Sequence, residues 1–167
     1  MNADGSAAPV IDKARFRQVL GHFPTGVTVI TATTPEGPAG LAVGSFFSVS
    51  LDPPLVAFCA SKTSSSYPKV ADAGHFVVNV LADDQEDVSR VFAASGADKF
   101  AGLGYRPSSY SGAPVLAGGL AWIDCDLDAV HEAGDHWIVV GRVHDLEVAH
   151  EGGPLIFFRG GYGRYTP

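Results

Sequence analysis

The sequence predicts a mainly β protein, an antiparallel barrel with peripheral helices. Runs rich in β-branched and apolar residues dominate the chain and indicate strands. The connections between these runs are often hairpin-like, and the few helical patterns stand at the edges of the strand groups. This order favours a closed antiparallel sheet over a βαβ sheet, in which strands and helices alternate regularly.

The first predicted element is a helix over residues 11–22, with Asp12 near its N-cap. A strand rich in β-branched residues follows over residues 27–33 and ends at a turn containing proline and glycine. The apolar side chains of the helical segment recur at helical spacing and form one stripe, made of Phe16, Val19, Leu20 and Phe23.

The next part of the chain contains two further strands, a helix and another strand. Residues 39–50 and 55–60 are the two predicted strands. Asp52-Pro53-Pro54 forms a sharp turn between them, because the residue before a proline avoids helical backbone angles. A short helix is expected over residues 65–73 and a strand over residues 75–81.

A third helix is predicted over residues 84–94, where Asp83 and Glu86 have the spacing of a capping box. Its apolar face consists of Val88, Val91 and Phe92. Residues 101–119 are rich in Gly, Pro and Ser, so we expect a long surface loop with little regular structure. The remaining strands are predicted over residues 120–131, 137–150 and 155–159.

Length and composition limit the class of protein. The 167 residues fit one domain, which we place at residues 11–167 after a disordered leader over residues 1–10. The formal net charge of −7 argues against partners such as nucleic acid or anionic membranes. No apolar run approaches the roughly twenty residues of a membrane span. Cys59 and Cys125 match no CxxC pattern and lie in apolar strands, so we expect buried, inert thiols in a cytoplasmic protein.

The segment over residues 40–56 is the most informative for function. Gly40 and Gly44 lack a Cβ atom and so leave room for a ligand near the backbone. Hydroxyls that need hydrogen-bond partners stand among apolar residues at Ser45, Ser48 and Ser50. This combination suits a flat aromatic ligand with polar edges. An ordinary strand-turn-strand unit with serines facing water explains the same pattern and stays open here.

A second polar cluster, Ser61-Lys62-Thr63-Ser64-Ser65-Ser66, follows a predicted strand and precedes a predicted helix. Hydroxyls, backbone N–H groups and one ammonium at a helix N-terminus suit a phosphate group. A serine-rich loop that only caps the helix is the alternative.

The six histidines show no recognised metal-ligand spacing, so we expect no metal site. His136 differs from the other five because Gly134-Asp135-His136 forms a tight turn at the start of a strand. Such a turn could project the imidazole from the rim of the barrel. A solvated histidine in an ordinary hairpin is the alternative.

Taken together, these motifs resemble the flavin reductase-like family, the short NAD(P)H:flavin oxidoreductases that supply two-component monooxygenases. The likeness extends from Phe16 to Tyr165, and each piece is weak alone. Their order and spacing are specific. The matching pieces are residues 23–31, 40–56, 61–64, 98–100, 134–136 and 160–163.

The resemblance implies a six-stranded antiparallel FMN-binding split barrel that forms a homodimer with the flavin at the subunit interface. The implied cofactors are FMN or FAD, with NADH or NADPH as hydride donor, and the implied partner is a flavin-dependent monooxygenase. Contacts to the flavin ring and ribityl chain are assigned to Ala42, Val43, Gly44, Ser45, Phe46, Ser48, Val49 and Ser50. The phosphate is assigned to Ser61, Lys62 and Ser64. On the nicotinamide side the resemblance places His136, as the catalytic residue, and Tyr162.

Two other functions stay open at this point: a flavin carrier without turnover, and a split-barrel protein that binds a different ligand such as haem. The sequence also departs from the family in one place. Many members carry hydroxyl residues where this chain has Ala42 and Gly44. Flavin contacts there would have to come from backbone groups and from Ser45.

Overall fold

An antiparallel sheet of seven strands forms the body of the protein in the computed structural model, which describes residues 11–96 and 98–165. The strands are β2 (Thr28–Thr34), β3 (Gly37–Val43), β4 (Phe47–Leu51), β5 (Pro54–Ser61), β6 (His75–Val80), β9 (Ala121–Ala133) and β10 (His136–Val148). Their order in the sheet is β3-β2-β6-β9-β10-β5-β4, and every neighbouring pair is antiparallel. The predicted mainly β, antiparallel fold is confirmed, although the main sheet has seven strands and not six.

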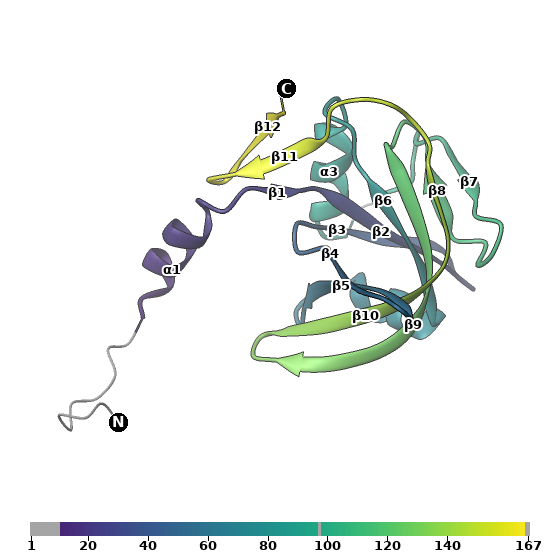
Figure 1. The fold of residues 1–167 in the computed structure, drawn as a ribbon, viewed down its shortest axis with the longest axis horizontal. Helices are drawn as coiled ribbons and strands as arrows, with labels where there is room; N and C mark the ends of the chain where they lie inside the picture. The colour runs from purple at the N-terminus through teal and green to yellow at the C-terminus, as the bar shows by residue number, and fades with distance from the viewer. Residues whose placement is uncertain (1–10, 97, 166–167) are drawn as a thin grey trace.

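Two small sheets and three helices complete the described part of the chain (Figure 1). The first small sheet contains β1 (Thr25–Gly26), β11 (Leu155–Phe158) and β12 (Gly161–Arg164), and the second contains β7 (Tyr105–Pro107) and β8 (Pro114–Leu116). The helices are α1 (Lys13–Leu20), α2 (Tyr67–Ala73) and α3 (Glu86–Ala93). None of the helices in the described residues has the length and apolar character that crossing a bilayer requires. The leader predicted for residues 1–10 lies outside the described residues.

The main sheet closes where the chain passes from β3 to β4. These two strands stand at opposite edges of the sheet, yet only residues 44–46 connect them. Such a short connection spans at most about 14 Å, so the two edges must come together. The prediction of one continuous strand over residues 39–50 is therefore wrong. Residues 44–46 instead form the crossing that brings the two edges together. Since β3 and β4 are not paired with each other, the closed sheet has a split at this point.

Helices α2 and α3 cover the barrel, whereas α1 stands apart from it (Figure 1). Tyr67 and Val70 of α2 pack into a buried cluster with Phe58 and Phe76 of the sheet. Phe92 of α3 joins a second cluster. Asp12 is the N-cap of α1, as predicted, and its side chain accepts a hydrogen bond from the Arg15 N–H at 3.2 Å. Every residue of α1 is exposed.

Two local predictions are wrong. The N-cap of α3 is Gln85, so Asp83 and Glu86 form no capping box. The Gln85 side chain instead accepts from the Ala82 N–H at 3.0 Å and donates to the Ala117 carbonyl at 2.9 Å.

Residues 101–119 are also not the irregular surface loop that their composition predicts. They contain the β7–β8 hairpin, and all of β8 is buried. The reason is a buried amide on a neighbouring strand: Asn79 accepts from the Leu116 N–H at 2.8 Å and donates to the Pro114 carbonyl at 3.3 Å. Backbone groups that a surface loop would expose to water are thus paired inside the fold.

Candidate functional site

A cavity of about 410 Å³ opens where the barrel closes. One wall is the end of β3 and the crossing to β4, and the opposite wall is the end of β5 with the serine-rich loop that follows it. The cavity is lined by residues 41–45, 59–61, 63–66 and 92–95, together with Lys99 and His136. Its position follows from the fold, because β3 and β5 come together only through the crossing.

The hydroxyl of Ser45 fastens this crossing to β5. Its Oγ accepts a hydrogen bond from the Cys59 N–H at 2.9 Å and donates to the Cys59 carbonyl at 3.2 Å. Ser45 thus pairs both backbone groups of Cys59 in place of a strand neighbour. The hydroxyl proton is already used within the protein, so a direct role of Ser45 toward a ligand is limited to its remaining acceptor capacity.

Gly40 and Gly44 differ in what a Cβ atom would meet at each position. A Cβ atom on Gly40 would lie 2.7 Å from Phe92 Cε1 and 2.8 Å from the Ile30 carbonyl oxygen. On Gly44 it would lie 2.9 Å from Thr25 Oγ1. Gly40 thus allows close packing of neighbouring elements, which corrects the interpretation that it leaves room for a ligand. Gly44 lines the cavity and meets only a rotatable hydroxyl, so room for a ligand beside it stays a prediction.

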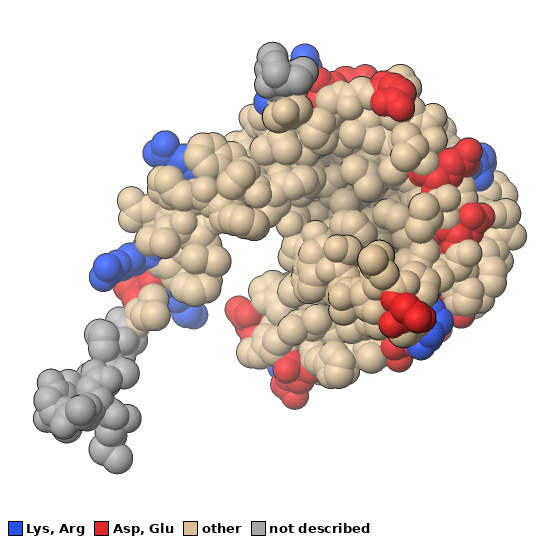
Figure 2. Space-filling model, viewed as in Figure 1, with Lys and Arg blue, Asp and Glu red and all other residues tan. Residues whose placement is uncertain are grey.

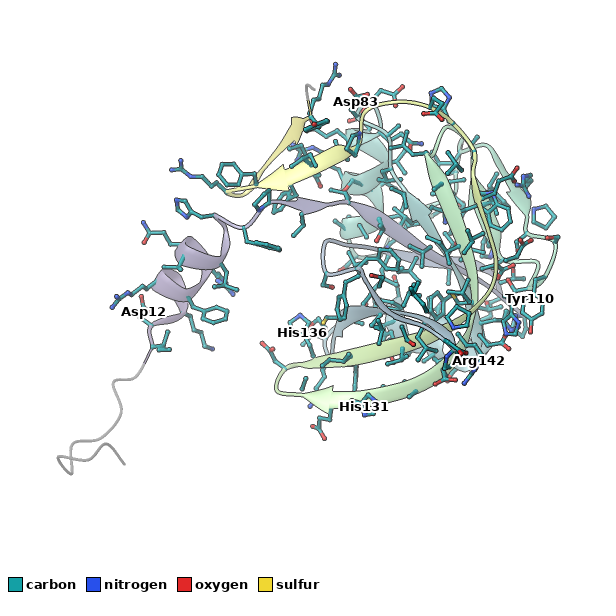
Figure 3. All side chains as sticks on the ribbon, in the orientation of Figure 1. Asp12, Asp83, Tyr110, His131, His136 and Arg142 are labelled. Carbon is teal, nitrogen blue, oxygen red and sulfur yellow. The ribbon has the colours of Figure 1, made fainter. Side chains whose placement is uncertain are left out.

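The turn that carries His136 is joined to the serine-rich loop. His136 is the register partner of Ser61, and the Lys62 N–H donates to the Asp135 carbonyl at 3.0 Å. The Asp135 carboxylate lies 2.7 Å from His136 Nδ1, and this hydrogen bond and charge lower the pKa of Asp135. With Nδ1 committed to Asp135, Nε2 is the ring nitrogen that can serve a ligand. His136 lies on the inner side of the β9–β10 hairpin, close to its turn (Figure 3).

Lys62 and Lys99 face different surroundings. The Lys62 ammonium forms an ion pair with Glu132 on β9 and lies 4.9 Å from the centre of the Trp137 ring. The hydrogen bond from Lys62 also lowers the pKa of Glu132. Lys99 is the lysine among the described residues that lines the cavity. The structure therefore directs the Lys62 ammonium toward β9 and brings a different cation to the site.

Of the residues predicted to bind the cofactor or act in catalysis, the cavity brings together Ala42, Val43, Gly44, Ser45, Ser61, Ser64 and His136. Within the described chain its lining does not include Phe46, Ser48, Val49, Ser50, Lys62 or Tyr162. Ser48, Val49 and Ser50 belong to the edge strand β4, which is largely exposed.

Tyr162 lines a neighbouring cavity of about 150 Å³. This smaller cavity shares Ala42, Val43 and Gly44 with the larger one, so β3 forms the wall between them. The Tyr162 hydroxyl lies 2.8 Å from Ser89 Oγ on α3, and the Arg90 guanidinium lies 4.9 Å from the centre of the tyrosine ring.

Sequence reasoning did not assign Lys99, Phe92 or Ser66 to the site. Lys99 belongs to the Asp98-Lys99-Phe100 motif, which signals the family but does not show where the ammonium points. Phe92 was predicted to lie on the apolar face of a helix, which is correct, and the residue also lines the cavity.

The lining suits a flavin nucleotide. Apolar side chains and small residues of β3, β5 and α3 form one part of the cavity, where a ring system can pack. The hydroxyls of residues 61 and 63–66 and the Lys99 ammonium form the other part, where a ribityl chain and a phosphate find donors. The chemistry of the residues present therefore fits this class of cofactor.

Comparison with known proteins identifies relatives along almost the whole chain. A family model described as flavin reductase like domain matches residues 20–166. A flavin reductase of Pseudomonas putida is 54% identical over 157 residues, which cover 93% of this chain and 92% of that protein. The reductase subunit of a flavin-dependent monooxygenase from Rhodococcus jostii is 47% identical, over 100% of this chain and 86% of the relative.

Solved structures agree with the sequence comparison. The NADH:FAD oxidoreductase SgcE6 of Streptomyces globisporus superposes with a TM-score of 0.85 at 36% identity, over 97% of this chain and 100% of that chain. The family model, the relatives and the shared fold identify this chain as a member of the flavin reductase-like family.

Proposed function

We propose that this protein is an NAD(P)H-dependent flavin reductase that supplies reduced flavin to a partner monooxygenase. The observation that carries the proposal is the cavity at the split of the barrel, which combines an apolar wall, a serine-rich loop, one lysine and His136. The relatives named above, a flavin reductase and a monooxygenase reductase subunit, support the same activity.

The residues of this chain bind and orient the flavin and nicotinamide cofactors. The chemistry of hydride transfer comes from those cofactors when they are bound. Backbone groups of residues 42–45 face the flavin ring and ribityl chain. Ser61 and Ser64 donate hydrogen bonds near the phosphate, with Ser64 also accepting from the Tyr67 N–H at 3.1 Å. His136, oriented by Asp135, holds the nicotinamide in place, because hydride transfer depends steeply on donor–acceptor geometry.

A flavin carrier without turnover is the competing function. Steady-state oxidation of NADH and NADPH, measured with added FMN, FAD or riboflavin, separates the two. Turnover that depends on added or bound flavin supports the reductase. A protein that retains flavin but oxidises neither nucleotide is a carrier, and the proposed activity is then wrong.

We further propose a homodimer in which a second copy of this chain covers the hollow between α1 and the barrel. Apolar side chains of α1 and of the segment after it are at least half exposed: Phe16, Val19, Leu20 and Phe23. Exposed apolar side chains in such number mark an interaction surface. In Figure 2 the walls of the hollow are mainly uncharged, which favours an apolar occupant.

A second copy fits because it offers the same elements in return. The edge strand β4 exposes Phe47, Val49 and Leu51, and an uncovered strand edge is readily paired or covered by another chain. In a two-fold dimer the α1 stripe of each copy and the β4 edge of the other would be buried together.

The two free cysteines agree with a reducing compartment, and we place the protein in the cytoplasm.

A further inference from the structure

Lys62 contacts both strands of the β9–β10 hairpin and also the turn between them. Its ammonium forms an ion pair with Glu132 near the end of β9 and lies 4.9 Å from the centre of the Trp137 ring near the start of β10. Its backbone N–H donates to the Asp135 carbonyl, in the turn itself, at 3.0 Å. Since Lys62 belongs to neither strand, a residue of the serine-rich loop holds the end of the hairpin from outside it.

The contacts of Lys62 surround His136 without touching it. Glu132 and Trp137 are register partners across the hairpin. The next pair toward the turn is Ala133 with His136. Because neighbouring residues of a strand point to opposite faces of the sheet, the side chains of Trp137 and His136 lie on opposite faces. The Lys62 ammonium therefore lies on the face away from the His136 imidazole, and Lys62 can affect that imidazole only through the hairpin.

The Lys62 side chain is more restricted than a free surface lysine. It is 29% exposed, and the Trp137 side chain beneath it packs against the buried cluster of the barrel. The hydrogen bond from Lys62 lowers the pKa of Glu132, so this carboxylate is charged at neutral pH. An isolated surface ion pair contributes little, but a cation that is also held over an aromatic ring restricts both partners.

His136 needs such support because its own surroundings are open. The Asp135 carboxylate that lies 2.7 Å from His136 Nδ1 is 94% exposed, and the imidazole itself is 46% exposed. An exposed pair of side chains in a turn keeps its direction only if the backbone of the turn is held. The Lys62 N–H and the Glu132 ion pair hold this backbone on the two sides of the turn.

We propose that Lys62 is a positioning residue for flavin reduction, which holds the β9–β10 turn through Glu132, Trp137 and Asp135 and so keeps the His136 imidazole directed into the cavity. This inference rests on the proposed function, because it takes His136 as the residue that places the nicotinamide. It differs from the phosphate contact that the family resemblance implies for Lys62. The two roles predict different effects of the same substitution.

The first experiment measures the limiting rate at which NADH reduces FMN under anaerobic conditions, together with the dissociation constants of FMN and riboflavin. Lys62→Met and Glu132→Gln should each lower the rate about three- to tenfold, because the turn is less well held and hydride transfer depends steeply on geometry. Both dissociation constants should stay within about twofold. Lys62→Arg keeps the charge and the contact with the Trp137 ring, so it should retain at least about half of the rate.

The matched control is Arg142→Met. Arg142 on β10 forms an ion pair with Asp128 on β9 at 2.7 Å, so this variant removes a cation that links the same two strands. Arg142 is six residues from His136 along β10, a distance of about 20 Å in a strand, and Figure 3 shows it far from the turn. Arg142→Met should leave the rate and both dissociation constants unchanged. A loss of rate equal to that of Lys62→Met would overturn the proposal.

A double variant tests whether Lys62 acts through His136. In the His136→Ala background, Lys62→Met should lower the rate by less than about twofold, because the imidazole that it positions is gone. The same loss as in the wild-type background would show an independent effect, and the proposal would be wrong. It would also be wrong if Lys62→Met weakened FMN about tenfold and left riboflavin unchanged, since that result assigns Lys62 to the phosphate.

The second experiment needs neither flavin nor turnover. Hydrogen exchange of the flavin-free protein, followed by mass spectrometry, reports how often the turn opens. A peptide that contains residues 132–137 should exchange at least about threefold faster in Lys62→Met and Glu132→Gln than in the wild type, and Arg142→Met should not change its exchange. Equal exchange in the wild type and both turn variants would overturn the proposal.

Failure of this inference and failure of the proposed function give different results. If the wild-type protein reduces flavin and the Lys62 and Glu132 variants match it in rate, only the inference is wrong. If the wild-type protein reduces no flavin, the proposed function is wrong and the positioning role is wrong with it. The exchange measurement then still shows whether Lys62 holds the turn.

Discussion

Ser45 satisfies both backbone groups of Cys59, accepting from its N–H at 2.9 Å and donating to its carbonyl at 3.2 Å. The pair joins the crossing between β3 and β4 to the neighbouring strand β5, at the point where the barrel closes. A residue first expected to contact the flavin thus holds the wall of the site in place.

Substitution of Ser45 by alanine should therefore destabilise the fold. It leaves the N–H and carbonyl of Cys59 without their partner, and each unsatisfied group costs about 1–3 kcal/mol. Chemical denaturation should show a loss in the free energy of unfolding of at least about 1 kcal/mol. Ser48→Ala on the exposed edge strand is the control and should change it little. Equal stability of wild type and Ser45→Ala would contradict the role given to the hydroxyl.

Gly40→Ala should also destabilise the protein, because the new Cβ meets the Phe92 ring and the rigid Ile30 carbonyl. Overpacking of this kind costs about 1–3 kcal/mol. Gly44→Ala should cost less, since its Cβ meets the Thr25 hydroxyl, which can rotate away. Thermal unfolding of the two variants compares them directly, and a larger loss for Gly44→Ala would be inconsistent with the packing described.

The two cysteines should react differently with a thiol reagent. Burial raises the pKa of the Cys125 thiol to about 12, with a further contribution from the Asp124 and Asp126 charges. The thiolate is the reactive form, so Cys125 should stay unlabelled in the native protein at neutral pH. The prediction that both thiols are buried is wrong for Cys59, which is partly exposed and lines the cavity. It should therefore be labelled, and bound flavin should slow that reaction. Mass spectrometry of the labelled peptides measures both reactions. Faster labelling of Cys125 than of Cys59 would contradict this account.

Disruption of the apolar stripe of α1 should weaken the proposed dimer. Leu20→Asp places a charge among side chains that a second copy buries, whereas Gln18→Asp places one on the opposite face of the same helix. Sedimentation at micromolar concentration should show a dimer for the wild type and Gln18→Asp, and monomer for Leu20→Asp. A wild-type monomer that still binds flavin tightly would rule out the interface model.

Much of the fold could be predicted from local pattern. The runs rich in β-branched residues that became β2, β6 and β10 are regular, and Asp12 caps its helix through a contact only three residues away. The order within residues 101–119 was not predictable, because it depends on Asn79, a buried amide distant in sequence.

The site was predictable only in part, for the same reason. Loop composition located the serine-rich cluster, and the turn before β10 located His136. The break after Gly44 and the direction of each lysine side chain depend on how the sheet closes. Neither Lys62 nor Lys99 carries a local signal that shows which of them faces the cavity.

The central claim is most directly tested by mixing the flavin-loaded protein with NADH under anaerobic conditions and following flavin absorbance by stopped flow. The wild-type protein should lose this absorbance as the flavin is reduced. His136→Ala should bind flavin with little change but reduce it at least about tenfold more slowly, equivalent to about 1.4 kcal/mol of transition-state stabilisation. A wild-type protein whose flavin keeps its absorbance with both NADH and NADPH would contradict the assignment as a reductase.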